Sequence, residues 1–166
     1  MRVFRTLIEG ASRSTPTADA TGLQVIVTVG AENDPAALGP QPAHVHVQRF
    51  IPQESLLPYC SAVVTHAGAG SILGALAFGV PLLAVPRGAD QFYNAERVVS
   101  AGAGLSLLPE QLEPGAVATQ LERVLREPAF RVAAQRIEAE IRALPSAEQA
   151  VATLEGLVAE TRAQAE

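Results

Sequence analysis

The sequence contains no lysine and no tryptophan, and Cys60 is its single cysteine. One cysteine excludes an internal disulfide, so we expect a buried structural thiol in a cytoplasmic protein. The first ten residues, MRVFRTLIEG, carry charges at Arg2, Arg5 and Glu9. They lack the apolar centre and the cleavage site of a secretory signal, and we expect none. No run approaches the roughly 18 consecutive apolar residues of a membrane span.

All 12 basic side chains are arginines, and the net charge is −5. We attribute the missing lysines to codon usage in a GC-rich genome rather than to a function. No basic run or aromatic–basic stripe occurs, so the sequence predicts no binding to nucleic acid. His44 and His46 share one face of a predicted strand, but no carboxylate or cysteine lies near them at the spacing of a metal ligand. We therefore expect neither a metal site nor a bound cofactor.

A chain of 166 residues, 48% of them hydrophobic, has the length of one domain with its own core, and we treat 1–166 as one domain. Apolar periodicity predicts a short helix or turn at 53–60 and helices at 2–12, 71–79 and 91–102. Apolar runs bounded by glycine or proline predict strands at 23–30, 45–50, 62–66, 82–86 and 104–108. A polar loop is expected at 12–22, and a helical segment at 113–162.

Strands alternate with helices along the chain, and the strands are apolar on both faces. This pattern predicts an α/β fold, a Rossmann-like parallel sheet with helices on both faces. In such a sheet, ligands bind beyond the carboxyl ends of the strands. The candidate functional residues are therefore those that directly follow the strands.

The segment VVTHAGAGSILGALAFGVP, residues 63–81, joins a strand to a glycine loop and a helix start. A helix N-terminus attracts anions, because its N–H groups are unpaired and its dipole is positive there. Gly68 and Gly70 let a phosphate approach the backbone. Ser71 offers a hydroxyl, and His66 lies at the strand end. The segment predicts a phosphate site; a tight turn with a buried, hydrogen-bonded histidine is an equally good interpretation.

Two further strand ends carry polar or aromatic side chains. RFIPQ, residues 49–53, suits stacking on a base and bonding to a ribose, or else a plain strand exit with a core phenylalanine. PRGADQ, residues 86–91, places Asp90 beside Gln91, and a carboxylate next to an amide suits sugar hydroxyls. Capping of the next helix by Asp90, with Asn94 just inside, is the alternative. Taken singly, each of these two segments favours its structural alternative, which is a plain strand exit for residues 49–53 and a helix cap for residues 86–91.

Together and in order, these segments resemble the donor-binding half of the family 1 GT-B glycosyltransferases. The similarity is strongest to bacterial enzymes that act on macrolide, enediyne and aromatic-polyketide natural products. Residues 49–107 carry the similarity almost end to end, and the flanks VFRTLIEG and LQVIVTVGAENDPAALGPQP extend it more weakly. The resemblance implies a transferase of the hexosyl type and one half of a GT-B fold.

The resemblance also implies a role for each matching residue of this chain. The base and ribose of a nucleotide sugar would be bound by stacking on Phe50, by the backbone of Ile51, and by Gln53. The diphosphate would be bound by His66, Gly68, Ala69, Gly70 and Ser71. Hydroxyls of the transferred sugar would be bound by Asp90 and Gln91.

One position departs from the plant members of the family, which have a ribose-binding glutamate where this chain has Gly74. The departure fits the bacterial members, many of which use dTDP-deoxysugars, and we expect dTDP to be favoured over UDP as the nucleotide. His66 is expected to stabilise the leaving diphosphate and not to act as the general base. We therefore expect no catalytic base in this chain.

A larger departure concerns the start of the donor domain. Family members have an N-terminal domain that binds the acceptor and often carries a histidine base; we expect that domain, and the first strand of the donor domain, to be absent. In the strand order 3-2-1-4-5-6 the first strand is central, so its absence leaves a slot of roughly 9–10 Å between the second and fourth strands. We expect a preceding segment of a longer chain, another segment, or a neighbouring copy in a homo-oligomer to fill the slot.

The resemblance thus implies the donor-binding domain of an inverting glycosyltransferase, which passes a sugar from a nucleoside diphosphate to a small natural-product acceptor. We expect this chain to be inactive alone, with the acceptor bound by an N-terminal domain or a partner chain. Two alternatives remain, namely the donor subunit of a two-chain glycosyltransferase and a non-catalytic nucleotide-binding module.

Overall fold

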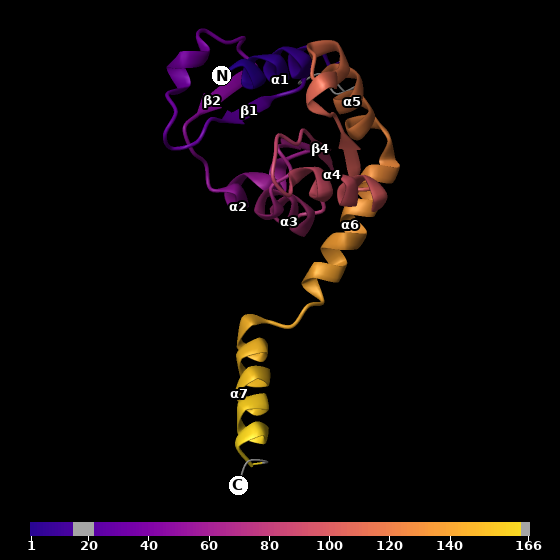
Figure 1. Cartoon of the computed structure of the whole chain (residues 1–166). Coiled ribbons are helices and arrows are strands. Elements are labelled where there is room, and N and C mark those ends of the chain that lie inside the picture. Colours follow the sequence, from indigo (N-terminus) through magenta and orange to yellow (C-terminus); the bar gives the residue numbers. More distant parts are fainter. Residues whose placement is uncertain (15–21, 164–166) are drawn as a thin grey trace.

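The computed structural model describes residues 1–14 and 22–163 of the chain. Helices and strands alternate along it, as the sequence predicts (Figure 1). The helices are α1 (Arg2–Arg13), α2 (Gln53–Leu56), α3 (Ala69–Ala77), α4 (Gln91–Ser100), α5 (Pro114–Arg126), α6 (Pro128–Arg142) and α7 (Ala147–Ala163). The strands are β1 (Val25–Thr28), β2 (Val45–Gln48), β3 (Val63–Thr65), β4 (Leu82–Ala84) and β5 (Gly104–Ser106). Most of the loop predicted at 12–22 lies outside the described residues.

The strands of the described residues form two parallel sheets, β1–β2 and β3–β4–β5. Val25 lies opposite Val45 in the first sheet, and Leu82 pairs with Val63 and Gly104 in the second. The predicted α/β class and the parallel strand direction are confirmed. The expected single sheet is divided, because no described strand lies between β1 and β3. These are the second and fourth strands of the expected order, so the division falls where the sequence predicts a slot.

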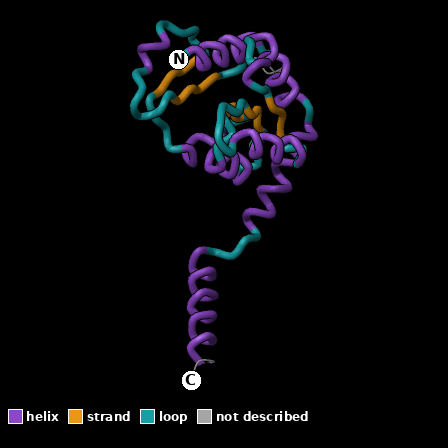
Figure 2. The backbone as a smooth tube through the Cα atoms, in the orientation of Figure 1, coloured by secondary structure: helices purple, strands orange, loops and turns teal. Residues whose placement is uncertain are grey.

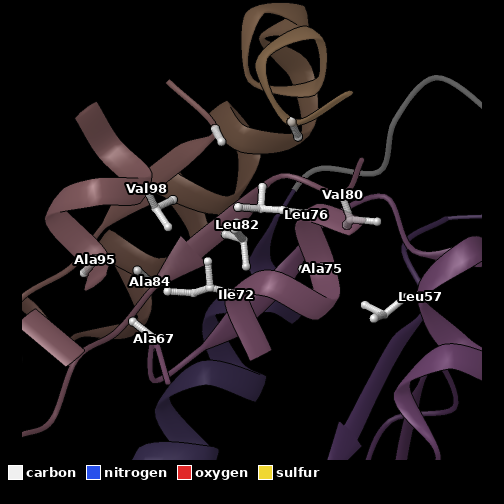
Figure 3. Packing of buried hydrophobic residues seen from close by; sticks show 12 residues of the cluster. Leu57, Ala67, Ile72, Ala75, Leu76, Val80, Leu82, Ala84, Ala95 and Val98 are labelled. Carbon is white, nitrogen blue, oxygen red and sulfur yellow. The ribbon is translucent and has the colours of Figure 1, made fainter. Parts of the chain in front are cut away.

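Strand β4 shows how helices come to cover both faces of the larger sheet, since all of its residues are buried. Leu82 and Ala84 belong to a cluster with buried residues of α3, α4 and α6, among them Ile72, Leu76, Ala95, Val98 and Ala134 (Figure 3). Leu83 belongs to a second cluster, formed with residues of α1 and α5 that include Ala11, Val117 and Leu121. Because neighbouring residues of a strand point to opposite faces, the two clusters lie on opposite sides of the sheet.

Helix α1 connects the two sheets through its apolar residues. Ala11 joins the cluster that contains Leu83 of the larger sheet. Ile8 joins a third cluster with Val29 and Val45 of the smaller sheet. The two sheets share no strand pairing, so packing against α1 holds them in place relative to each other.

The contact between α1 and α5 depends on a glycine. A Cβ on Gly10 would lie 2.5 Å from the Cβ of Val117 and 2.8 Å from the carbonyl oxygen of Pro114. Real Cβ atoms do not approach other atoms so closely, and both neighbours belong to α5. The backbone of α1 therefore lies directly on α5 at this point.

Helix α3 begins earlier than the sequence predicts. The expected start is residue 71, but the helix starts at Ala69, because Ser71 and Ile72 already donate their N–H groups to the carbonyl oxygen of Gly68 (3.0 and 3.1 Å). Gly79 has a φ of 62°, a left-handed conformation that favours glycine, and the helix ends just before it. The helix-stop signal at this glycine is confirmed.

Helix α7 extends away from the rest of the described chain (Figures 1 and 2). The apolar side chains of Val151, Leu154 and Leu157 are 53%, 62% and 55% exposed. None of the helices within residues 1–14 and 22–163 combines the length and the apolar content needed to cross a bilayer.

We predict that Gly10→Ala lowers the free energy of unfolding by about 1–3 kcal/mol, because the added methyl group overpacks the contact between α1 and α5. Chemical denaturation followed by circular dichroism measures the change. Gly115→Ala is the matched control, since a Cβ at Gly115 of α5 meets no atom within 4 Å. Equal stabilities of the two variants would contradict the close approach of the helices.

Candidate functional site

The predicted site residues follow the carboxyl ends of three parallel strands. Residues 49–53 follow β2, residues 66–71 follow β3, and residues 86–91 follow β4 closely. Parallel strands end at the same edge of a sheet, so loops after β3 and β4 are neighbours there. The start of α3 lies directly after the loop of β3 (Figure 1). These segments are the framework of the candidate site.

The loop after β3 holds an alanine in a left-handed conformation. Ala67 has a φ of 66° and is fully buried. A left-handed residue other than glycine carries strain of about 1–2 kcal/mol. Two side chains hold this turn: Thr65 Oγ1 accepts a hydrogen bond from the Ala67 N–H (3.3 Å), and Asn94 Nδ2 donates to the Ala67 carbonyl oxygen (3.1 Å).

The imidazole of His66 lies across Gly68. A Cβ on Gly68 would be 2.6 Å from His66 Nε2, so a glycine is needed here for the ring to keep its position. His66 is exposed, which rules out the interpretation of a buried histidine in a tight turn. Within the described residues, the ring makes no hydrogen bond, and its Nε2 lies beside Gly68, the residue just before α3. A ligand at the start of α3 therefore lies within reach of the imidazole.

The first turn of α3 presents backbone N–H groups. The helix begins after Gly68, and its first turn contains no acidic residue. The N–H groups of Ala69 and Gly70 precede the first donors bonded within the helix and have no partner in it. A Cβ at Gly70 would meet no atom within 4 Å, so the surface above this turn is open. An anion placed here would meet unpaired donors at the positive end of the helix dipole.

The loop after β4 fixes the orientation of two polar side chains. Gln91 Oε1 accepts hydrogen bonds from the N–H groups of Arg87 (2.8 Å) and Gly88 (3.2 Å). The amide oxygen of Gln91 is thereby engaged, and its NH₂ group is the part left to donate to a ligand. Asp90 stands at the N-cap position of α4, as the alternative interpretation expects, but its exposed side chain makes no capping hydrogen bond to the backbone of the helix.

Asn94 joins the two loops that follow β3 and β4. Its Nδ2 donates to the Ala67 carbonyl oxygen (3.1 Å) and to Asp90 Oδ2 (2.9 Å). Both loops contain a left-handed alanine, Ala67 with a φ of 66° and Ala89 with a φ of 52°. In the sequence, Asn94 is predicted only to lie just inside the helix cap. Asn94 lies four residues, about one helical turn, after Asp90, and this spacing could have predicted the hydrogen bond between their side chains. No sequence pattern predicts the bond from Asn94 to the Ala67 carbonyl oxygen.

The loop after β2 places an aromatic ring in solvent. Phe50 is 70% exposed, which excludes the core phenylalanine of the alternative interpretation. Ile51 is half-buried. Gln53, the first residue of α2, reaches α3: a Cβ on Gly74 would lie 3.2 Å from Gln53 Oε1. The missing side chain at Gly74 is thus what lets the Gln53 carboxamide lie against α3.

Contacts with α3 and with the loop before it connect several of the predicted residues. Asn94 fastens the loop of His66 to Asp90, and Gln53 contacts α3 at Gly74. Phe50 and Ile51 lie two or three residues before Gln53, on the same connection. No contact places Phe50 against the other predicted residues, and it extends into solvent at the edge of the group.

The other two histidines and the cysteine are not among the candidate site residues. His44 Nε2 bonds with Ser12 Oγ and His46 Nε2 with Gln24 Oε1, each at 3.1 Å, and the described residues hold no cluster of metal-ligating side chains.

Burial raises the pKa of the Cys60 thiol, and the nearby positive charge of Arg131 opposes this. A raised pKa keeps the thiol protonated and unreactive, as expected for a structural cysteine.

Comparison with known protein families gives one match over most of the chain. The family model described as "Erythromycin biosynthesis protein CIII-like, C-terminal domain" matches residues 16–157. The match includes all three strand-end segments and the two parallel sheets.

Curated relatives are bacterial biosynthetic enzymes. 4'-Demethylrebeccamycin synthase of Lentzea aerocolonigenes is 40% identical over 139 residues, which are 84% of this chain and 32% of that protein. Elloramycin glycosyltransferase ElmGT of Streptomyces olivaceus is 45% identical over 118 residues, 70% of this chain and 29% of that protein. The chain thus spans about a third of the length of the curated relatives it matches.

Solved structures of glycosyltransferases superpose on nearly the whole chain. The calicheamicin glycosyltransferase CalG4 matches with a TM-score of 0.85 and 31% identity, covering 96% of this chain and 40% of that one. The glycosyltransferase VinC, solved in complex with dTDP, matches with a TM-score of 0.80 and 34% identity, covering 94% of this chain and 37% of that one. The fold is therefore that of one part of a GT-B glycosyltransferase.

We predict that Asn94→Ala loosens the loop at 66–71. The substitution leaves the buried Ala67 carbonyl without its donor, which costs about 1–3 kcal/mol of stability. Amide hydrogen exchange read by NMR should speed up at Ala67 and Gly68. Asn33→Ala is the matched control, because Asn33 Nδ2 also donates to a single backbone carbonyl, that of Val29 (2.8 Å), far from this loop. Equal exchange in the loop of both variants would count against the role of Asn94.

Proposed function

The chain belongs to the family of C-terminal domains like that of erythromycin biosynthesis protein CIII. From this membership, we propose that it binds the nucleoside diphosphate sugar of a natural-product glycosyltransferase. The observation that carries the proposal is that Asn94 joins the segments after β3 and β4 beside the start of α3, while Gln53, after β2, contacts the same helix at Gly74. One segment offers an aromatic ring, one offers unpaired N–H donors with a histidine, and one offers a carboxylate with an amide. These are the chemical partners of a base, a diphosphate and a sugar.

The diphosphate is assigned to the start of α3 and His66. The N–H groups of Ala69 and Gly70 donate to phosphate oxygens, and the helix dipole adds favourable charge. His66 donates a further hydrogen bond from the exposed imidazole beside Gly68. The same donors stabilise the diphosphate as negative charge develops on it during departure, which is the role we give to His66 in place of a general base.

The nucleoside is assigned to Phe50, Ile51 and Gln53. The exposed ring of Phe50 stacks on the base, the Ile51 backbone bonds to its edge, and Gln53 bonds to the ribose. Gly74 supplies no carboxylate for a ribose 2'-hydroxyl, and the Gln53 amide occupies the space beside it. We therefore propose dTDP in preference to UDP. The similar enzymes VinC and spinosyn rhamnosyltransferase SpnG were both solved in complex with thymidine diphosphate (dTDP), which supports this choice.

The transferred sugar is assigned to Asp90 and Gln91. Asp90 accepts hydrogen bonds from sugar hydroxyls, and Gln91 donates through its NH₂ group because its oxygen is bonded to Arg87 and Gly88. In the proposed reaction, an acceptor hydroxyl attacks the anomeric carbon, the bond to the nucleoside diphosphate breaks, and the configuration inverts. We propose that the acceptor site and the general base lie outside this chain and that the chain alone is inactive. We place the reaction in the cytoplasm, in keeping with the free thiol of Cys60.

We predict that dTDP binds this chain in isothermal titration calorimetry, more tightly than UDP, and that His66→Ala weakens dTDP binding about tenfold or more. The expected loss is that of one hydrogen bond to a charged group, about 1.5–3 kcal/mol. His46→Ala is the control, because His46 is an exposed histidine that bonds to Gln24 instead. An equal dTDP affinity in the two variants would overturn the assignment of His66 to the diphosphate.

We also predict that EDTA leaves dTDP affinity unchanged. The proposal assigns the charge of the diphosphate to backbone donors and His66, so no divalent cation is needed as a bridge. The same titration with EDTA and then with added Mg²⁺ provides the check. Binding that disappears with EDTA and returns with Mg²⁺ would mean that a metal shares the diphosphate.

A further inference from the structure

Asn94 uses both hydrogens of its carboxamide on two neighbouring loops. Its Nδ2 donates to the carbonyl oxygen of Ala67, in the loop after β3 (3.1 Å), and to Oδ2 of Asp90, in the loop after β4 (2.9 Å). Both acceptors are oxygens, so the end of the amide that faces them is the nitrogen, which carries two hydrogens. With one hydrogen bonded on each side, the planar carboxamide cannot turn toward one acceptor without losing the other.

The bond to Ala67 sets the direction of the next backbone donor. The peptide bond between Ala67 and Gly68 is trans, so its carbonyl and its N–H point to opposite sides of one rigid plane. Asn94 holds the carbonyl on the side of α4, and the Gly68 N–H therefore points away from α4. Among the described residues this N–H has no acceptor. It directly precedes the unpaired N–H groups of Ala69 and Gly70, and so is a third donor at the start of α3.

Rotation of this peptide is the freedom that remains to the loop. The methyl group of Ala67 is fully buried in a cluster with residues of α3 and α4 (Figure 3). The Ala67 N–H is bonded to Thr65 Oγ1 (3.3 Å), so the preceding peptide is held as well. Gly68 has no Cβ that would resist a turn of the peptide between it and Ala67. The hydrogen bond from Asn94 opposes that turn and keeps the Gly68 N–H in its direction.

The carboxylate of Asp90 depends on the same carboxamide. Within the described residues, Asn94 is the one hydrogen-bond partner of the Asp90 side chain, which is exposed and makes no capping bond to α4. Oδ2 is thus held by Asn94, and Oδ1 is left to accept from a sugar hydroxyl. A hydroxyl that fixes this carboxylate therefore also fixes the carboxamide of Asn94, and with it the carbonyl of Ala67.

We propose that Asn94 is a positioning residue that couples the diphosphate and sugar parts of the site, because it directs the Gly68 N–H toward the diphosphate while it holds the Asp90 carboxylate for the sugar. The effect of this coupling on ligand binding rests on the proposed function. Coupling between two sites is reciprocal, so an ordered Asp90 strengthens diphosphate binding and a bound diphosphate orders Asp90. A carboxylate in the sugar part thus affects the affinity for a nucleotide that carries no sugar to transfer.

The test compares two substitutions of Asp90 with dTDP, which lacks the transferred sugar. Asp90→Ala and Asp90→Asn both remove the negative charge, but only Asp90→Asn keeps an oxygen that accepts a hydrogen bond from Asn94. Each substitution is made alone and together with Asn94→Ala. Isothermal titration calorimetry measures the dTDP affinity of these variants and of the native chain. NMR without nucleotide measures amide exchange at Ala67.

With Asn94 present, we expect Asp90→Ala to bind dTDP about threefold or more weakly than Asp90→Asn, which is the effect of one lost hydrogen bond. Amide exchange at Ala67 is expected to be faster in Asp90→Ala than in Asp90→Asn, because the loop opens more often. Combined with Asn94→Ala, the two substitutions of Asp90 are expected to give equal affinities and equal exchange, since the link is already broken.

Equal dTDP affinities of the two variants with Asn94 present overturn the proposal, and both variants keep the fold because Asp90 is exposed. The same difference in affinity with and without Asn94 also overturns it, since Asp90 then acts by another route. If the native chain binds no dTDP, the proposed function fails. The link between the two loops then stands or falls with the exchange at Ala67, which is measured without nucleotide.

Discussion

The packing of α1 against both sheets is the constraint on which the rest of the structure depends. The segment at 49–53, proposed to bind the nucleoside, follows the smaller sheet, whereas the segments proposed to bind the diphosphate and the sugar follow the larger one. No ladder of hydrogen bonds joins the two sheets among the described residues. Their spacing is therefore set by side-chain packing, with the backbone of α1 lying on α5 at Gly10. A methyl group added to that contact would therefore shift the two halves of the proposed ligand site relative to each other. Helix α1 itself supplies no residue to that site.

The site combines strain with side chains that hold it. Two alanines with positive φ, Ala67 and Ala89, lie in the loops that follow β3 and β4, and each carries about 1–2 kcal/mol of strain. Asn94 and Gln91 bond to the backbone of these loops and use part of their own hydrogen-bonding capacity to do so. The consequence is directional: the atoms left over on Asp90 and Gln91 accept and donate in fixed roles.

Much of the fold could be predicted from local sequence, because its signals are local. Apolar strands bounded by glycine or proline, and helices that end at Gly79 or begin at Pro114 and Pro128, follow from backbone rules. The exposure of Phe50 and His66 could not be predicted, since a strand end is compatible with either burial or solvent. The bond of Asn94 to Ala67 joins residues 27 positions apart and depends on how β3 and β4 pair. Contacts between residues so far apart in the sequence depend on how the strands and helices pack. They cannot be predicted from the local sequence pattern.

Helix α7 stands apart from the buried interior of the described chain. The three buried clusters of the described chain contain no residue beyond Ile141, and α7 begins at Ala147. A substitution in Val151 or Leu154 thus changes the surface of α7 without changing the interior that the other helices share with the sheets. The packing of the three clusters therefore does not depend on which apolar side chains α7 carries.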